Sequence, residues 1–257
     1  MRHGRVVILG GGQGGFQTAM SLREQGFDDC IVLVGEERDL PYQRPPLSKA
    51  YLAGSVDAEA VRLRPQSFYA HHDIELLTGE RASAIDRRAR RLALASGTTL
   101  AYDHLVLAVG ARPRRLPIPG ADLDGVMDLR TLADATELRE RLAAAREVVL
   151  VGAGFIGLEF AAVAAKQGKP VRIVEATGRV MARVVSPPVS RCFAAAHARW
   201  GAKLLFETCI ARVLGERGCV VAVETTCGEM LPADLIVICV GVEPNVELAA
   251  DAGLATD

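Results

Sequence analysis

The sequence has no long hydrophobic run, no block of positive charge and no cluster of metal-ligating side chains. Its longest apolar runs are only as long as a strand, which excludes a membrane-spanning helix. A net charge of −1 gives no electrostatic support for binding nucleic acid. The adjacent His71 and His72 cannot share a face of one helix or strand. We therefore expect a protein that neither spans a membrane nor binds nucleic acid or a metal ion.

Cysteine is present but follows no motif. The six cysteines are Cys30, Cys192, Cys209, Cys219, Cys227 and Cys239, and no two of them form a C-x-x-C pair. Scattered thiols are typical of a reducing compartment. Residues 1–4 lead directly into a predicted strand, so we expect no signal peptide. We therefore expect a cytoplasmic protein with reduced thiols.

One sequence motif occurs in two copies. Each copy has a short apolar strand, Val6–Leu9 or Val148–Val151, then a G-x-G-x-x-G turn and an Ala-rich amphipathic segment. The glycines of these turns are Gly10, Gly12 and Gly15, and Gly152, Gly154 and Gly157. A second apolar strand and an acid follow, Glu36 or Glu175, about 20 residues after the last glycine. This is the dinucleotide-binding βαβ pattern.

Two complete copies predict that the chain holds two dinucleotides at once, which indicates electron transfer between them. The glycines would allow the tight turn, the approach of the backbone to a pyrophosphate and close helix packing. The phosphates would lie at a helix N-terminus, which favours anions. Ordinary βα turns with glycines used only for packing are the alternative. The strand, helix and acid recur in both copies, which disfavours that alternative.

A second repeat indicates an α/β fold with two Rossmann-like domains. Residues 101–110 and 232–241 are similar apolar runs that end in glycine, and short strands are predicted before each. These lie around Ala82–Asp86, Arg91–Ala95 and Thr98–Tyr102, and around Ile210–Leu214 and Val220–Thr225. A proline-rich segment at 112–120 and a helix at 131–146 lead into the second copy. We expect a first domain at 1–115, a second at 116–244, and a return to the first at 245–257.

Several motifs together resemble the FAD- and NADH-dependent ferredoxin reductases. They are Arg44–Leu52, Leu105–Gly110, Leu129–Leu132, Gly154–Glu159 and Gly241–Asn245, in this order. The resemblance covers nearly the whole chain. It implies electron transfer from NADH through FAD to a small iron–sulfur protein of the ferredoxin type, serving a monooxygenase or dioxygenase. It also implies that the first copy is the FAD domain and the second the NADH domain.

The resemblance implies roles for individual residues. Glu36 would bind the adenosine ribose of FAD, Ala82 the adenine end through its backbone, and Arg130 the flavin side. Lys49 would lie beside the flavin ring and Glu159 near the nicotinamide, paired with that lysine; these two are the predicted catalytic residues. The predicted cofactor-binding set is Gly10, Gly12, Gly14, Gly15, Glu36, Arg44, Pro45, Lys49, Ala82, Arg130, Gly152, Gly154, Gly157, Glu159, Glu175 and Gly241.

Composition agrees with a role for Lys49. Only four of the thirty basic residues are lysine, so arginine is the usual cation of this chain. A lysine in the P-P-L-S-K segment indicates a need for a compact point charge, which would stabilise a reduced, anionic flavin. Glu159 has an alternative role, because an acid early in a helix also stabilises the helix dipole.

The family's chain returns to the FAD domain and adds an interface domain, which residues 245–257 only begin to resemble. We therefore expect a fragment in which FAD is weakly held or absent and ferredoxin reduction is negligible. An NADH oxidase, peroxidase or disulfide reductase needs a redox cysteine near the flavin, whereas no cysteine lies between Cys30 and Cys192. A non-catalytic or inactive nucleotide-binding flavoprotein is the other alternative.

Overall fold

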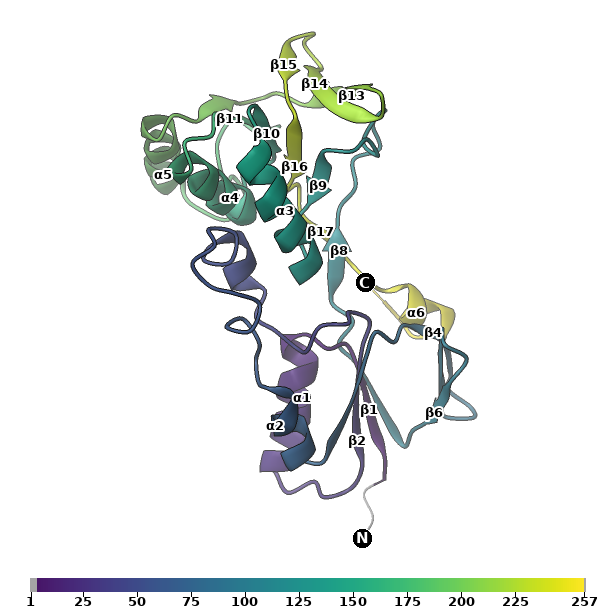
Figure 1. Ribbon diagram of the computed structural model, residues 1–257. Coiled ribbons are helices and arrows are strands. Elements are labelled where there is room, and N and C mark those ends of the chain that lie inside the picture. The colour runs from purple at the N-terminus through teal and green to yellow at the C-terminus, as the bar shows by residue number, and fades with distance from the viewer. Residues whose placement is uncertain (1–3, 257) are drawn as a thin grey trace. The chain divides into compact units, whose positions relative to one another are not determined.

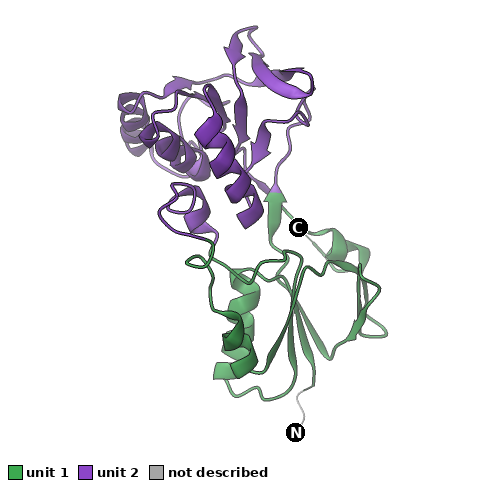
Figure 2. Ribbon diagram, viewed as in Figure 1, with its two compact units in different colours: residues 1–43, 58–112, 244–257 green, residues 44–57, 113–243 purple. Residues whose placement is uncertain are grey.

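The computed structural model describes residues 4–256 and confirms the predicted α/β class (Figure 1). The chain divides into two compact units, coloured separately in Figure 2. Unit 1 comprises residues 1–43, 58–112 and 244–257, and unit 2 comprises residues 44–57 and 113–243. Residues 44–57 thus cluster with unit 2, although the sequence assigned them to the first domain. Which dinucleotide each unit binds stays a prediction.

Unit 1 contains a parallel four-stranded sheet in the order β3-β2-β1-β7. The strands are β1 (Val6–Leu9), β2 (Ile31–Gly35), β3 (Ile74–Thr78) and β7 (His104–Leu107), and the helices are α1 (Gln13–Glu24), α2 (Gln66–His71) and α6 (Glu247–Asp251). The crossovers from β1 through α1 to β2, and from β2 through α2 to β3, run in the same direction along the sheet, so the usual crossover hand brings both helices to the same face. Side chains of α1 and α2 accordingly share one buried cluster with β1 and β2.

The opposite face of this sheet is covered by a three-stranded antiparallel meander of β4 (Ala82–Asp86), β5 (Arg91–Leu94) and β6 (Thr99–Ala101). These strands confirm the predicted ones. Leu92, Leu94 and Leu100 pack from the meander against the sheet. The C-terminal helix α6 contacts β4, and Arg87 donates hydrogen bonds to the carbonyls of Ala252 and Gly253 at 3.4 and 3.1 Å.

Unit 2 has the same plan with one more strand. Its parallel sheet has the order β12-β11-β10-β16-β9. The strands are β9 (Val126–Asp128), β10 (Val148–Val151), β11 (Val171–Val174), β12 (Lys203–Leu205) and β16 (Leu235–Ile238), and the helices are α3 (Leu132–Ala144), α4 (Phe155–Lys166) and α5 (Pro187–Arg199). A capping box of Thr131 and Asp134 begins α3, which lies within the predicted 131–146. The short 3₁₀ helix η1 (Pro45–Ser48) contacts α3 and α4.

A second meander covers one face of this sheet; two of its three strands were predicted, and β15 was not. Its strands are β13 (Ile210–Glu216), β14 (Cys219–Thr225) and β15 (Met230–Pro232). Val213, Val223 and Leu231 pack from it against the sheet. The short strands β8 (Ala111–Pro113) and β17 (Val242–Pro244) pair with each other, where the chain enters unit 2 and where it leaves.

We expect His197 of α5 to make the stability of the protein depend on pH. Its side chain is buried, its ring lies 5.1 Å from that of Trp200, and burial lowers its pKa below the ordinary 6.5. Below about pH 6.5 the unfolded chain therefore binds a proton at this residue that the folded chain does not. The free energy of unfolding should fall as the pH drops from 7 towards 5, by at most about 1.4 kcal/mol per pH unit from this group.

Urea unfolding of the protein and of His197→Phe at several pH values measures this effect. Other groups contribute equally to both proteins, so the difference between the two curves isolates His197. Any excess in the free energy of unfolding of the protein over that of His197→Phe should shrink towards pH 5, or the variant should become the more stable of the two. Two parallel curves would contradict the expectation.

Candidate functional site

The first glycine of each G-x-G-x-x-G turn has a backbone conformation that other residues rarely adopt. Gly10 has φ +120° and Gly152 has φ +97°. A Cβ atom at Gly10 would lie 2.1 Å from the carbonyl oxygen of Ala108, and one at Gly152 would lie 2.5 Å from that of Cys239. Each turn therefore lies directly against the chain that leaves β7 or β16, at the carboxyl edge of its sheet.

In each turn, the third glycine of the motif packs against the first, and the second glycine has open space beside it. A Cβ at Gly15 would lie 1.9 Å from the oxygen of Gly10, and one at Gly157 would lie 2.4 Å from that of Gly152. A Cβ at Gly12 or Gly154 would meet nothing within 4 Å.

Gly12 and Gly154 are also the N-cap residues of α1 and α4, and neither offers a side-chain cap. The first N–H groups of both helices therefore lack a side-chain acceptor at the N-cap, and a phosphate is a suitable acceptor for them. The open space at both glycines lets a ligand approach this backbone. Both turns fit a dinucleotide.

The two predicted ribose acceptors differ in their surroundings. Glu36 follows β2 directly, and its carboxylate lies 3.5 Å from Nη1 of Arg81 with both side chains well exposed. Glu175 follows β11 directly and accepts hydrogen bonds from the backbone N–H groups of Ala153 and Thr177, at 2.7 and 2.9 Å. Both acids thus lie at the carboxyl edge of a sheet, near the glycine turn.

The remaining predicted positions of unit 1 are Gly14 and Ala82. Gly14 is exposed in the first turn of α1, and its carbonyl accepts a hydrogen bond from the Thr18 hydroxyl at 2.8 Å. Ala82 is half-buried at the start of β4, opposite Leu94. The contacts of Gly14 and Ala82 within the described residues do not indicate a binding role for either one, so their roles stay predictions.

Within unit 2, Lys49 and Glu159 form an ion pair, with Nζ 2.7 Å from Oε2. The same oxygen accepts a hydrogen bond from the Ser48 hydroxyl at 2.5 Å, and Lys49 also donates to the carbonyl of Pro45 at 3.1 Å. Ser48 is buried, whereas the Lys49 side chain is half-exposed at 51%. Ser48 was not among the predicted site residues, because a serine before a lysine has no signal of its own.

Segment 44–57 is held on unit 2 by further polar contacts. Arg44 donates to the carbonyl of Arg130 at 2.5 Å, which brings two predicted cofactor residues together. The buried Tyr51 hydroxyl lies 2.7 Å from Oγ1 of Thr136. Because Thr136 already donates to the Leu132 carbonyl, Tyr51 is the donor in this pair.

Tyr51 and Tyr69 provide a matched test of this attachment. Both are buried, but the Tyr69 hydroxyl has no hydrogen-bond partner among residues 4–256, and burial raises the pKa of Tyr69 to about 12. Tyr51→Phe should lower the free energy of unfolding by about 1 kcal/mol, since it leaves Thr136 without its donor. Tyr69→Phe should be neutral or stabilising. Urea denaturation of both variants measures this; equal losses would contradict the expected contrast.

Two further features lie at the same edge of the unit 2 sheet. Gly241, with φ +112°, precedes β17, and its carbonyl accepts the N–H of Arg114 at 3.0 Å. Phe155 and Ile156, between Gly154 and Gly157, are 52% and 42% exposed although both are large and apolar. Exposed apolar side chains beside an open glycine turn are suited to contact with a ligand ring.

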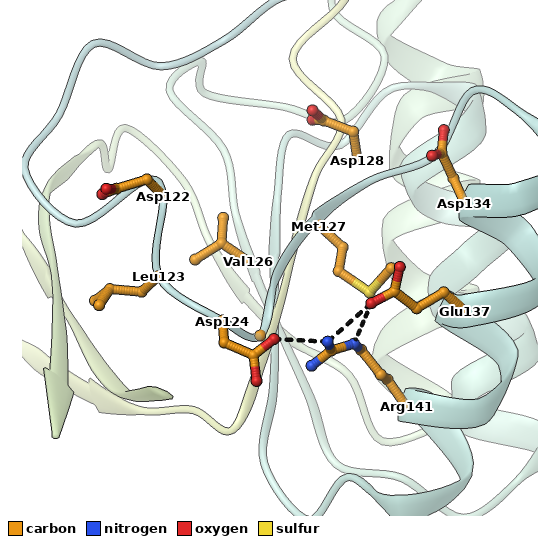
Figure 3. A pocket seen from close by; sticks show the side chains of 10 residues that line it. Asp122, Leu123, Asp124, Val126, Met127, Asp128, Asp134, Glu137 and Arg141 are labelled. Carbon is orange, nitrogen blue, oxygen red and sulfur yellow. Dashed lines mark hydrogen bonds and ion pairs between the residues drawn. The ribbon is translucent and has the colours of Figure 1, made fainter. Parts of the chain in front are cut away.

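A pocket of about 330 Å³ in unit 2 lies apart from these turns, beside β9 and α3 (Figure 3). Five of its lining side chains are acidic: Asp122, Asp124, Asp128, Asp134 and Glu137. Arg141 lies between Asp124 and Glu137, at 2.6 and 2.8 Å. The acidic lining disfavours phosphates. Among the described residues no group of His, Cys, Asp and Glu side chains is suited to a metal ion.

No helix in residues 4–256 combines the length and the hydropathy that crossing a bilayer requires.

A profile of the pyridine nucleotide-disulphide oxidoreductases matches residues 4–257. The chain belongs to this family.

Several of the proteins similar to this chain are named as reductases. The chain is 46% identical to rhodocoxin reductase of Rhodococcus erythropolis over 98% of its own length and 59% of the relative. The ferredoxin reductase of the CYP199A2 system from Rhodopseudomonas palustris has a TM-score of 0.96 at 47% identity, over 98% of this chain and 62% of that one. The structure of the covalent putidaredoxin reductase–putidaredoxin complex has a TM-score of 0.96 at 40% identity, over 100% of this chain and 63% of that one. The chain thus spans about three fifths of their lengths.

Cys239 follows β16, whose last residue Ile238 pairs with Asp128. Burial, together with the charge of Asp128, raises the pKa of Cys239 to about 12. The thiol therefore stays protonated at neutral pH and is unsuited to act as a redox nucleophile. The six cysteines of the chain are all free.

Proposed function

We propose that the protein is a flavoprotein oxidoreductase that transfers electrons from NADH, through FAD, to a small iron–sulfur protein of the ferredoxin type that serves an oxygenase. The observation that carries the proposal is the pair of open glycine turns, each at the carboxyl edge of a parallel sheet and each followed by an acid. Relatives named ferredoxin, rubredoxin and putidaredoxin reductases support this partner class.

The turn of unit 1 would hold FAD. Gly10, Gly12, Gly14 and Gly15 would present the backbone of α1 to the pyrophosphate, and Glu36 would accept hydrogen bonds from the adenosine ribose. Ala82 would contribute a backbone contact to the adenine end. When bound, FAD supplies the chemistry of accepting a hydride and releasing its electrons one at a time.

The turn of unit 2 would hold NADH. Gly152, Gly154 and Gly157 would receive its pyrophosphate, Glu175 its adenosine ribose, and Gly241 would allow close approach to the backbone. The exposed side chains of Phe155 and Ile156 offer apolar surface beside this turn.

Lys49 and Glu159 would provide the charge near the reacting rings, with Arg44, Pro45 and Arg130 as neighbours. The ion pair at 2.7 Å compensates the negative charge of Glu159, which would otherwise repel a dinucleotide phosphate. It also holds the Lys49 ammonium in place, and Ser48 holds the same carboxylate. A preorganised positive charge favours a cofactor that becomes negative on reduction.

Two readouts test the function. The purified protein, supplied with excess FAD because we expect it to hold FAD weakly, should show a flavin absorption spectrum that bleaches on addition of NADH, and any reduction of a ferredoxin by it should require both FAD and NADH. A bound flavin that NADH does not bleach would favour a non-catalytic flavoprotein instead. Bleaching followed by efficient reduction of a disulfide substrate, and of no ferredoxin, would overturn the proposed acceptor.

The cellular location is part of the proposal. Six free cysteines agree with a reducing compartment, and we place the protein in the cytoplasm.

A further inference from the structure

The carboxylate of Glu175 is held by three donors within unit 2. Its Oε2 accepts the N–H of Ala153, in the glycine turn, at 2.7 Å. Its Oε1 accepts the N–H and the hydroxyl of Thr177 at 2.9 and 2.7 Å. Both carboxylate oxygens are therefore engaged, one from each side, and the side chain has little freedom to turn away.

The Thr177 hydroxyl has one proton and two nearby acceptors. Oγ1 lies 2.7 Å from Glu175 Oε1 and 3.0 Å from the Arg179 carbonyl. A charged carboxylate is the stronger acceptor, and it is also the closer one, so the proton points to Glu175.

Unit 1 offers an internal comparison. Glu36 occupies the equivalent position after β2, but the residue two positions later is Arg38. The Glu36 side chain is 66% exposed, and it has an ion pair with Arg81 at 3.5 Å but no hydrogen bond from the backbone within residues 4–256. The three-donor arrangement is thus a property of the second βαβ unit and not of the repeat.

We propose that Thr177 is a positioning residue that determines specificity, holding Glu175 so that the site of unit 2 accepts NAD(H) and rejects dinucleotides with a 2′-phosphate. The inference rests on the proposed function. A 2′-phosphate would meet a fixed carboxylate, and relief of the repulsion would require Glu175 to break its three hydrogen bonds. A carboxylate with fewer donors could swing out at lower cost.

The two arginines close to Glu175 in the sequence are directed to other partners. Arg179 donates to the carbonyls of Val185 and Ala182, at 2.8 and 2.5 Å. Arg172 is paired with Glu147. Release of Glu175 should therefore weaken the rejection of a 2′-phosphate without creating a phosphate site, so the preference should narrow but not reverse.

Dissociation constants of NAD⁺ and NADP⁺, measured by calorimetry on the FAD-loaded protein, test the inference. The unchanged protein should prefer NAD⁺. Thr177→Val, which keeps the shape and the backbone N–H but removes the hydroxyl, should narrow that preference by about three- to tenfold. Thr177→Ser should restore it. In a Glu175→Ala background Thr177→Val should have no effect on the ratio, because Thr177 acts through Glu175.

The possible failures can be told apart. If the unchanged protein prefers NAD⁺ but Thr177→Val keeps the same ratio with an unaltered unfolding midpoint, the role of Thr177 is wrong and the proposed function stands. If the unchanged protein binds both dinucleotides equally, the specificity proposal fails. If it binds neither, and NADH does not bleach the flavin, the proposed function fails as well.

Discussion

Gly15→Ala should destabilise the apoprotein by about 3 kcal/mol, whereas Gly12→Ala should cost less than about 1 kcal/mol. The two glycines are three residues apart in the same turn. A methyl group at Gly15 would lie 1.9 Å from the backbone oxygen of Gly10, and it can be accommodated only if α1 moves away from β1. A methyl group at Gly12 meets nothing within 4 Å, and its φ of −82° suits alanine.

The same pair separates folding from cofactor binding. Gly12 leaves space where the pyrophosphate is proposed to approach, so Gly12→Ala should weaken FAD binding at least about tenfold while the apoprotein stays folded. Urea denaturation without FAD and flavin titration of each variant measure the two effects. Equal loss of stability in both variants would show that the open space at Gly12 is needed for folding. Unchanged FAD affinity in Gly12→Ala would argue against a cofactor at this turn.

Lys49→Met should slow the reduction of bound FAD by NADH about tenfold, and it should change NADH affinity much less. The positive charge helps the reduced, negatively charged cofactor more than the oxidised one, so it acts on the reaction rather than on binding. The Lys49 side chain is half-exposed, and solvent screening keeps the expected effect well below that of a fully buried group. Stopped-flow bleaching at saturating NADH gives the limiting rate.

Glu159 is the control for this prediction. Lys49→Met leaves the Glu159 carboxylate with only the Ser48 hydroxyl as a described donor, so part of the loss comes from uncompensated negative charge. Adding Glu159→Gln should recover that part, and the two substitutions should not be additive, since the groups touch. An unchanged limiting rate in Lys49→Met would mean that the lysine is structural.

Local pattern was sufficient to predict most of the fold. The two strands of each βαβ unit, the closing strands β7 and β16, strands β4, β5, β6, β13 and β14, and helix α3 follow from periodicity and turn residues, which act over a few positions. Strands β3, β9, β12 and β15 were not predicted. The glycine turns could also be predicted from local sequence, because a tight turn beside a strand tolerates few residue types other than glycine.

The contacts of residues 44–57 could not be predicted from local sequence pattern. Ser48 meets Glu159, and Tyr51 meets Thr136, across long stretches of chain. Hydrogen bonds between such distant positions leave no local pattern, and only the family resemblance suggested that Lys49 and Glu159 meet. The role of Thr177 was missed for a related reason: an ordinary loop threonine becomes informative only once its hydroxyl is seen on Glu175.

The division of unit 1 into separate stretches of the chain has a consequence for synthesis on the ribosome. Helix α6, which contacts β4, lies after all of the 113–243 segment in the sequence. At typical translation rates, roughly ten seconds pass between the emergence of β8 and that of α6. During that interval unit 2 can fold completely, while the side of β4 that α6 will cover stays exposed to chaperones and to other nascent chains. The unit that begins first is therefore expected to finish last.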